Sequence, residues 1–167
     1  IVRGPKPLIA EIAGVATAAG SALAASCDLA VASDKATFAT PGVHIGLFCS
    51  TPMVALSRNV APKHAMEMLL TGASVSAADA ARMGLVNKVV AADVLTAETE
   101  AMARLIASKS PLTLKIGKEA FYAQREMTLD DAYRLTAEVM VENMLARDAE
   151  EGISAFIEKR HPVWEGR

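Results

Sequence analysis

The chain has 167 residues, 52% of them hydrophobic and 22% charged, with seven prolines; this suffices for a domain with a sizeable core and excludes a disordered chain. The 17 basic and 19 acidic residues give a net charge of −2 without a long basic run, so no nucleic-acid partner is expected. No apolar run reaches the roughly 18 residues of a membrane span, so we expect no membrane association. Cys27 and Cys49 match neither a disulfide framework nor a zinc site. We therefore expect no metal site and a reducing compartment.

The first part of the chain predicts strands around one short helix. Leu8–Ile12 is a short apolar run between a Pro-Lys-Pro turn and a glycine, which is typical of a buried strand. A turn of very small residues at 16–20 leads into a short helix over Ser21–Ser26. Two further strands are predicted at Asp28–Ser33 and Thr37–Ala39.

After a break at Pro41–Gly42, helices dominate the pattern. The Pro62–Leu70 helix is expected to place Ala65, Met66 and Leu69 on one face. The other predicted elements are a helix over Met53–Arg58 capped by Ser50 or Thr51, a helix over Ala77–Met83 opened by a Ser76–Asp79 capping box, a strand over Leu85–Val90, and helices over Val94–Ala107, Pro111–Ala123, Leu129–Leu145 and Glu150–Lys159. The sequence therefore predicts an α/β fold over residues 1–90 followed by an α-helical region over residues 91–167.

The small-residue turn at 16–20 is the first candidate functional site. Its side chains leave the backbone N–H groups uncovered at the start of a predicted helix. Unpaired donors and the helix dipole both favour an incoming negative oxygen at such a position. The residues fit either an oxyanion-binding turn or a plain tight turn before a buried helix.

The polar residues near this turn have both chemical and structural interpretations. His44 is either a replacement base or a core histidine. Cys49 is either a nucleophile paired with His44 or a buried structural cysteine, and no third group is evident to orient the pair. Asp28 and Asp34 are either catalysts or turn and strand-end residues. Thr17, Ser21 and Ser50 either line a pocket or are ordinary small polar residues of tight turns.

Three separated segments resemble the crotonase family, which is the enoyl-CoA hydratase/isomerase superfamily. They are Ile9–Ser33 with Phe38–Gly46, Thr71–Val90 (TGASVSAADAARMGLVNKVV) and Glu150–Trp164 (EEGISAFIEKRHPVW). The match covers essentially the whole chain but only about the last two thirds of a family domain. It implies repeated β-β-α units, with residues 1–90 forming a partial core and residues 91–167 forming a helical trimerisation region.

The resemblance implies an acyl-CoA thioester as the ligand. In this family two backbone N–H groups hold the thioester carbonyl; one maps onto Ala19, and no residue of this sequence matches the other. The positions implied to bind substrate are Thr17, Ala18, Gly20 and His44, together with Phe156 and Lys159, which match a contact to the CoA of a neighbouring subunit but also fit a solvated helix face. CoA is part of the substrate, so no separate cofactor is expected. We expect a homotrimer or hexamer, in the cytoplasm by default or in the mitochondrial matrix if a targeting segment precedes Ile1.

Two departures from the family pattern bear on activity. The family's hydratases carry a glutamate after the turn and a second after the proline that follows the third strand, where this chain has Ala22 and Gly42. Neither residue can transfer a proton, and general acid–base catalysis contributes about 10²–10⁴-fold per group. The turn also contains Ala18-Ala19-Gly20 where three glycines are common.

The sequence therefore predicts an acyl-CoA thioester-binding member of this family in fatty-acid or acyl-CoA metabolism, of the lyase or isomerase class if it is an enzyme. Efficient enoyl-CoA hydration is not expected. The alternative is a non-catalytic acyl-CoA binder or a partner subunit of an active paralogue.

Overall fold

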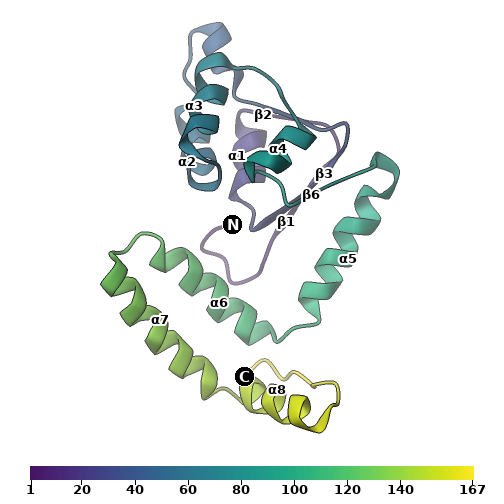
Figure 1. The fold of residues 1–167 in the computed structure, drawn as a ribbon, viewed down its shortest axis with the longest axis vertical. Helices are drawn as coiled ribbons and strands as arrows, with labels where there is room; N and C mark the ends of the chain where they lie inside the picture. The colour runs from purple at the N-terminus through teal and green to yellow at the C-terminus, as the bar shows by residue number, and fades with distance from the viewer. The chain divides into compact units, whose positions relative to one another are not determined.

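The structure, a computed structural model that describes residues 1–167, contains two units (Figure 1). Unit 1 comprises residues 1 and 8–103, and unit 2 comprises residues 2–7 and 104–167. All the strands belong to unit 1, and unit 2 is helical. The mixed α/β class predicted from the sequence is confirmed.

Two three-stranded sheets organise unit 1. In the first, β1 pairs with β3 and β3 pairs with β6, all in parallel. In the second, β2 pairs in parallel with β4, and β4 pairs antiparallel with β5. This pairing places Thr17 opposite Ala39, so β2 and β4 end side by side. The strand bounds are Ile9–Ile12 for β1, Val15–Thr17 for β2, Leu29–Ser33 for β3, Thr37–Ala39 for β4, Val75–Ser76 for β5 and Lys88–Val90 for β6.

Helices connect the strands of unit 1. Their bounds are Ala19–Ser26 for α1, Pro41–Ile45 for the 3₁₀ helix η1, Ser50–Asn59 for α2, Pro62–Thr71 for α3, Ala77–Met83 for α4, Ala92–Val94 for the 3₁₀ helix η2 and Leu95–Ala107 for α5, which continues into unit 2. The predicted cap of α4 is confirmed, because the Asp79 N–H donates to the Ser76 hydroxyl at 3.1 Å. Gly84 ends α4 at φ 83°, a conformation that has no steric cost for glycine.

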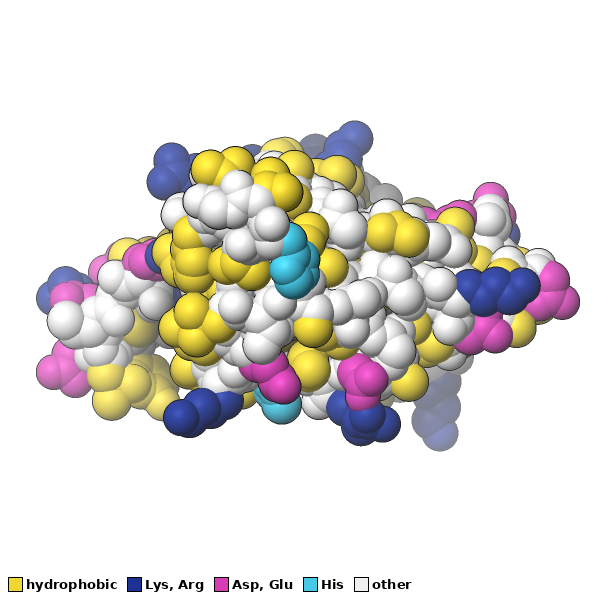
Figure 2. All heavy atoms as spheres, turned by 90° about the horizontal axis from the view of Figure 1, so that it is seen from above, with side chains coloured by type: hydrophobic (Ala, Val, Ile, Leu, Met, Phe, Trp, Pro, Cys, Tyr) yellow, Lys and Arg dark blue, Asp and Glu magenta, His cyan; other side chains and the backbone are white.

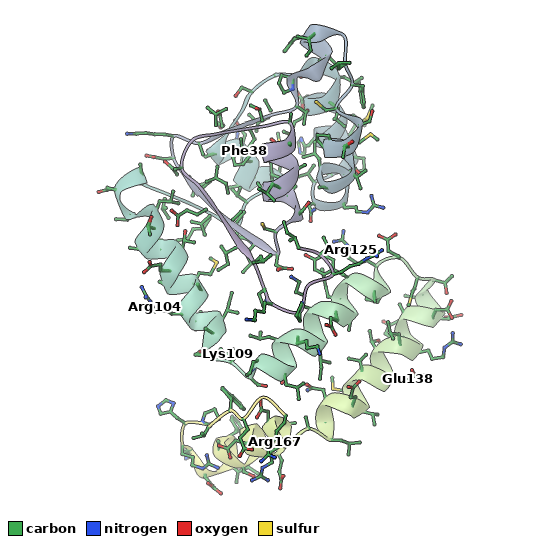
Figure 3. All side chains as sticks on the ribbon, turned by 180° about the vertical axis from the view of Figure 1, so that it is seen from behind. Phe38, Arg104, Lys109, Arg125, Glu138 and Arg167 are labelled. Atoms are coloured by element: carbon green, nitrogen blue, oxygen red, sulfur yellow. The ribbon has the colours of Figure 1, made fainter.

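The core of unit 1 combines a few large side chains with many alanines. Phe38 of β4 is fully buried (Figure 3), and so are Val31 of β3 and Leu56 of α2. The alanines let segments approach closely, as where α1 packs against α2. On α3 the buried methionine is Met68, which is 1% exposed, whereas Met66 is 46% exposed. The buried face of α3 therefore contains Ala65, Met68 and Leu69, and Met66 lies outside it.

Three other local predictions also need correction. Ala16 and Thr17, which were predicted in the turn, belong with Val15 to strand β2, because these residues pair with β4. The N-cap of α2 is Cys49, and neither Ser50 nor Thr51 caps it, since the Ser50 hydroxyl donates to the Phe48 carbonyl at 3.3 Å. The strand predicted from residue 85 starts at residue 88, because the Leu85 N–H bonds back to Ala80 and ends α4.

Unit 2 consists of helices and the chain's last residues. The helix bounds are Pro111–Gln124 for α6, Leu129–Met144 for α7 and Arg147–Glu158 for α8. Ser110 and Thr128 cap α6 and α7 through their hydroxyl oxygens, as the general preference for such caps predicts. None of the helices combines the length and apolar composition that a membrane span requires. The expected division at residue 90 concerns the family domain and stays a prediction.

Asp148 ties the end of the chain to the start of α8. Its side chain is 2% exposed and accepts a hydrogen bond from the Ser110 hydroxyl at 2.6 Å. It also accepts from the N–H groups of Glu165 at 2.7 Å and Gly166 at 3.0 Å. One buried carboxylate therefore joins the N-cap of α6, the first turn of α8 and the C-terminal residues.

The single tryptophan of the chain, Trp164, lies in this C-terminal segment. Its Nε1–H donates to the Ser108 carbonyl at 2.8 Å. Its ring packs on Gly152 of α8 so closely that a Cβ atom there would lie 3.2 Å from it. Trp164 is therefore a natural probe of how the C-terminal residues are held in unit 2.

Candidate functional site

The candidate site is the turn between β2 and α1. Thr17 ends β2, Ala18 alone forms the turn, and Ala19 and Gly20 begin the helix. Ala18 has φ 46° and ψ −109°, a backbone conformation that is strained for any residue with a Cβ atom. The Ala18 N–H donates to the Ala39 carbonyl at the end of β4 (2.9 Å), and the Ala18 carbonyl accepts from the Ala22 N–H (3.0 Å). The turn is therefore held on both sides.

These two hydrogen bonds fix the direction of the Ala19 N–H. The chain has no cis peptide bond, so the Ala19 N–H lies opposite the Ala18 carbonyl across a planar trans peptide. That carbonyl points into α1 toward Ala22, and the Ala19 N–H consequently points away from the helix. Ala19 and Gly20 are exposed, and their N–H groups precede the first hydrogen bond within the helix. The Ala19 N–H is therefore a backbone donor that faces outward at a helix N-terminus, where a negative oxygen is favoured.

Relief of the strain at Ala18 gives a testable consequence. We expect Ala18→Gly to raise the free energy of unfolding by about 1 kcal/mol, because the strain relieved is about 1–3 kcal/mol and the extra entropy of unfolded glycine offsets part of it. Urea denaturation of both proteins measures the difference. The control is Ala101→Gly on the exposed face of α5, which is expected to lose about 1 kcal/mol. A lower free energy of unfolding in both Ala18→Gly and Ala101→Gly would contradict the strain at Ala18.

No acidic group stands beside this turn in α1. The first turn of the helix contains no acidic residue, and Ala22 is partly buried. The α1 side of the turn thus offers hydrogen-bond donors but no group that accepts or delivers a proton.

The second non-acidic position, Gly42, is crowded by its own loop. It lies in η1, and its carbonyl accepts from the Leu47 N–H at 2.9 Å. A Cβ atom on Gly42 would lie 2.6 Å from the Leu47 carbonyl oxygen and 2.9 Å from Cys49 Sγ. Residue 42 therefore has no room for a side chain unless this loop moves, a feature that sequence reasoning missed.

His44 is directed toward the end of α3. Its Nε2 lies 3.3 Å from the carbonyl oxygen of Gly72, and a Cβ atom on Gly72 would lie 2.7 Å from the same nitrogen. The ring therefore packs on Gly72, which ends α3 at φ 64°. Cys49 lies against Gly42 instead, and no hydrogen bond joins Cys49 to His44.

Apolar side chains lie exposed along the same loop. Ile45 is 77% exposed and Leu47 is 62% exposed, and Phe48 follows them. Figure 2 shows hydrophobic side chains gathered around a histidine on the face that it displays. Unit 1 thus presents apolar surface three to six residues beyond Gly42.

The two aspartates considered as catalysts have structural partners. Asp28 Oδ2 accepts from the Leu8 N–H at 2.7 Å, and so joins β1 to the start of β3. Asp34 Oδ1 accepts from the Ser33 hydroxyl at 3.2 Å in the turn after β3. Both contacts match the turn and strand-end interpretation.

Phe156 and Lys159 lie in unit 2, at the end of α8. Phe156 is 84% exposed, and Lys159 ends the helix in the left-handed conformation at φ 56°. The Lys159 N–H donates to the Phe156 carbonyl at 3.3 Å. An exposed aromatic ring and a cationic side chain therefore stand one turn apart.

The family assignment follows from comparison with known proteins. A family model described as enoyl-CoA hydratase/isomerase matches residues 1–167. The chain belongs to the enoyl-CoA hydratase/isomerase family, which confirms the resemblance and the crotonase fold predicted from it.

Individual relatives agree with this assignment. The enoyl-CoA hydratase domain-containing protein 3, mitochondrial, of Xenopus laevis is 56% identical over 160 residues, which are 96% of this chain and 54% of the relative. The crystal structure of an enoyl-CoA hydratase from Mycobacterium smegmatis matches with a TM-score of 0.96 and 52% identity, over 98% of this chain and 64% of that one. The human enoyl-CoA hydratase domain-containing protein 3 matches with a TM-score of 0.95 and 54% identity, over 98% and 65% of the two chains. The chain thus spans about half the length of the curated relatives that it matches.

Proposed function

We propose that this protein binds an acyl-CoA thioester whose carbonyl oxygen accepts a hydrogen bond from the Ala19 N–H. The observation that carries the proposal is the fixed Ala18–Ala19 peptide, with its carbonyl bonded to Ala22 and its N–H directed outward. A donor held in advance stabilises negative charge on oxygen without reorganisation when that charge forms. Membership of the enoyl-CoA hydratase/isomerase family supports a thioester as the source of that oxygen.

The rest of the ligand would lie on residues around this turn, and its CoA would also reach a neighbouring subunit. Thr17, Ala18, Gly20 and His44 are the proposed neighbours of the acyl-thioester part, and the exposed apolar side chains at residues 45, 47 and 48 would favour the acyl chain. Phe156 and Lys159 are proposed to contact the CoA bound by a neighbouring subunit, since a lysine ammonium suits its phosphates. CoA enters as part of the substrate, with no separate cofactor.

The assembly and compartment are also part of the proposal. We infer a homotrimer or hexamer, in which the exposed apolar side chains of α7 such as Met140 and Met144 would be covered. The mitochondrial names of the relatives favour the mitochondrial matrix over the cytoplasm.

A non-catalytic binder, or a partner subunit of an active paralogue, is the second candidate. The specific observation in its favour is that the first turn of α1 has no acid and that the loop fills the space at residue 42. Catalysis would need another base, which would take the α-proton of the thioester and leave an enolate whose oxygen is held by the Ala19 N–H. The two candidates share the thioester site and differ only in turnover.

A pair of matched ligands tests the site. Titration calorimetry compares butyryl-CoA with S-butyl-CoA, which lacks only the carbonyl oxygen. We expect butyryl-CoA to bind about tenfold more tightly, as one hydrogen bond of about 1.4 kcal/mol requires. Equal affinities would contradict the carbonyl site, and binding of neither ligand would contradict the acyl-CoA proposal. Assays of turnover over a panel of CoA esters then separate enzyme from binder.

A further inference from the structure

Ser21 is a buried polar residue next to the proposed donor. It lies in the first turn of α1 and is 2% exposed. Its Oγ lies 2.7 Å from the carbonyl oxygen of Ala16 and 3.1 Å from that of Ala39. The hydroxyl has one proton to donate, and both acceptors lie within its reach.

These two carbonyl groups belong to the two paired strands next to the turn. Ala16 lies in β2 and Ala39 ends β4, and the two strands are paired in parallel. The Ala39 carbonyl also accepts from the Ala18 N–H at 2.9 Å. Ser21 and Ala18 therefore share one acceptor, and Ser21 connects α1 to both strands at the strained turn.

We propose that Ser21 is a positioning residue, which holds the Ala18–Ala19 peptide so that the Ala19 N–H faces the ligand. The proposal rests on the function proposed above and adds a residue to its site. Ala18 keeps an unfavourable conformation only because its surroundings impose it. Without the Ser21 hydroxyl, the start of α1 is free to shift from the strand ends, and Ala18 can relax. Relaxation rotates the Ala18–Ala19 peptide and turns the donor away.

The same helix supplies a matched control. Ser26 also donates to a main-chain carbonyl at 2.7 Å, but its acceptor is Ala22 in its own helix. Ser26→Ala therefore removes a side-chain hydrogen bond of equal length without touching a strand end. A difference between Ser21→Ala and Ser26→Ala reports the connection to the strands, not the loss of a hydroxyl.

The first measurement needs no ligand. Amide hydrogen exchange of Ala18 is followed by NMR in wild type, Ser21→Ala and Ser26→Ala, with the amide of buried Val31 as the reference for overall stability. Relative to Val31, exchange at Ala18 is expected to be at least about tenfold faster in Ser21→Ala and unchanged in Ser26→Ala. Equal exchange rates at Ala18, relative to Val31, in Ser21→Ala and Ser26→Ala would overturn the proposal. If Ser21→Ala does not fold, Ser21→Cys, which is close in size and a weak donor, is measured in the same way, with faster exchange as support and no change as refutation.

The second measurement addresses the donor itself. The ¹³C resonance of [1-¹³C]butyryl-CoA moves downfield when its carbonyl accepts a hydrogen bond. We expect this shift on wild type and Ser26→Ala, and its loss or reduction on bound Ser21→Ala, which a purely structural role would not cause. A full shift on Ser21→Ala would overturn the positioning role. If wild type binds no butyryl-CoA, the proposed function fails, while the exchange experiment still decides whether Ser21 holds the turn.

Discussion

Hydration of crotonyl-CoA by this protein is expected to be at least about 10⁴-fold slower than hydration by a family member that carries both glutamates. The two positions are occupied by Ala22 and Gly42, and each missing acid or base removes about 10²–10⁴-fold. The outward-facing Ala19 donor can polarise a thioester, but it cannot deliver a proton to the acyl chain or activate water. The measurement is the loss of enoyl absorbance with the protein expressed from its complete reading frame. A rate within tenfold of the glutamate-bearing enzyme would contradict the prediction.

Restoring the glutamates is not expected to restore the rate. A side chain at residue 42 meets the Leu47 carbonyl oxygen at 2.6 Å and Cys49 Sγ at 2.9 Å, and such overpacking costs about 1–3 kcal/mol. The Ala22→Glu, Gly42→Glu double variant should therefore be less stable and still inactive. Gly14→Ala is the control, because its Cβ atom would meet nothing within 4 Å. A stable and active double variant would show that the loop adapts easily.

The elements that the sequence predicts well are those with local signals. The capping box of Ser76 and Asp79, the glycine that ends α4 and the strand Thr37–Ala39 are each specified by neighbouring residues, and each is present. Strand β2 was missed because its three residues gain strand geometry only by pairing with β4, about 22 residues later. Met66 and Met68 are both compatible with an apolar face, and tertiary packing selects the second.

The same distinction between local signals and contacts between segments applies to the candidate site. The small-residue turn and the non-acidic positions 22 and 42 are visible in the sequence. The direction of the Ala19 N–H is not, because it depends on hydrogen bonds that Ala18 makes to Ala39 and Ala22. The crowding at Gly42 depends on how the chain folds back five to seven residues later. Sequence can indicate which groups are present at such a site, whereas contacts between segments decide which of them are usable.

Removal of the Asp148 carboxylate is expected to destabilise unit 2 by about 3 kcal/mol. Asp148→Ala leaves the Ser110 hydroxyl and the N–H groups of Glu165 and Gly166 without their acceptor, and each buried unsatisfied donor costs about 1–3 kcal/mol. Trp164 lies next to Glu165, so its fluorescence follows the loss of the C-terminal residues during urea unfolding. Asp130→Asn, at an exposed position in the first turn of α7, is the control and should change little. An unchanged Trp164 transition in Asp148→Ala would contradict the role of the carboxylate.

The same carboxylate predicts how unit 2 responds to acid. Burial raises the pKa of Asp148, but hydrogen bonds from Ser110, Glu165 and Gly166 lower it by more, so the net pKa lies below its ordinary value. A lowered folded-state pKa means that the contribution to stability is complete above the unfolded pKa of about 3.9 and is lost as the pH falls through the folded value. The neighbouring Glu151 has a pKa lowered to about 2 by Arg160 and the Val163 N–H, so it acts in the same direction and is present in every variant. Asp148→Asn keeps the side chain's shape without its charge. At neutral pH the stability measured from the Trp164 unfolding transition should therefore be lower in Asp148→Asn than in wild type. Below about pH 4 the two stabilities should converge. Parallel curves for the two proteins down to pH 2 would show that Asp148 is not the group whose protonation releases the C-terminal residues.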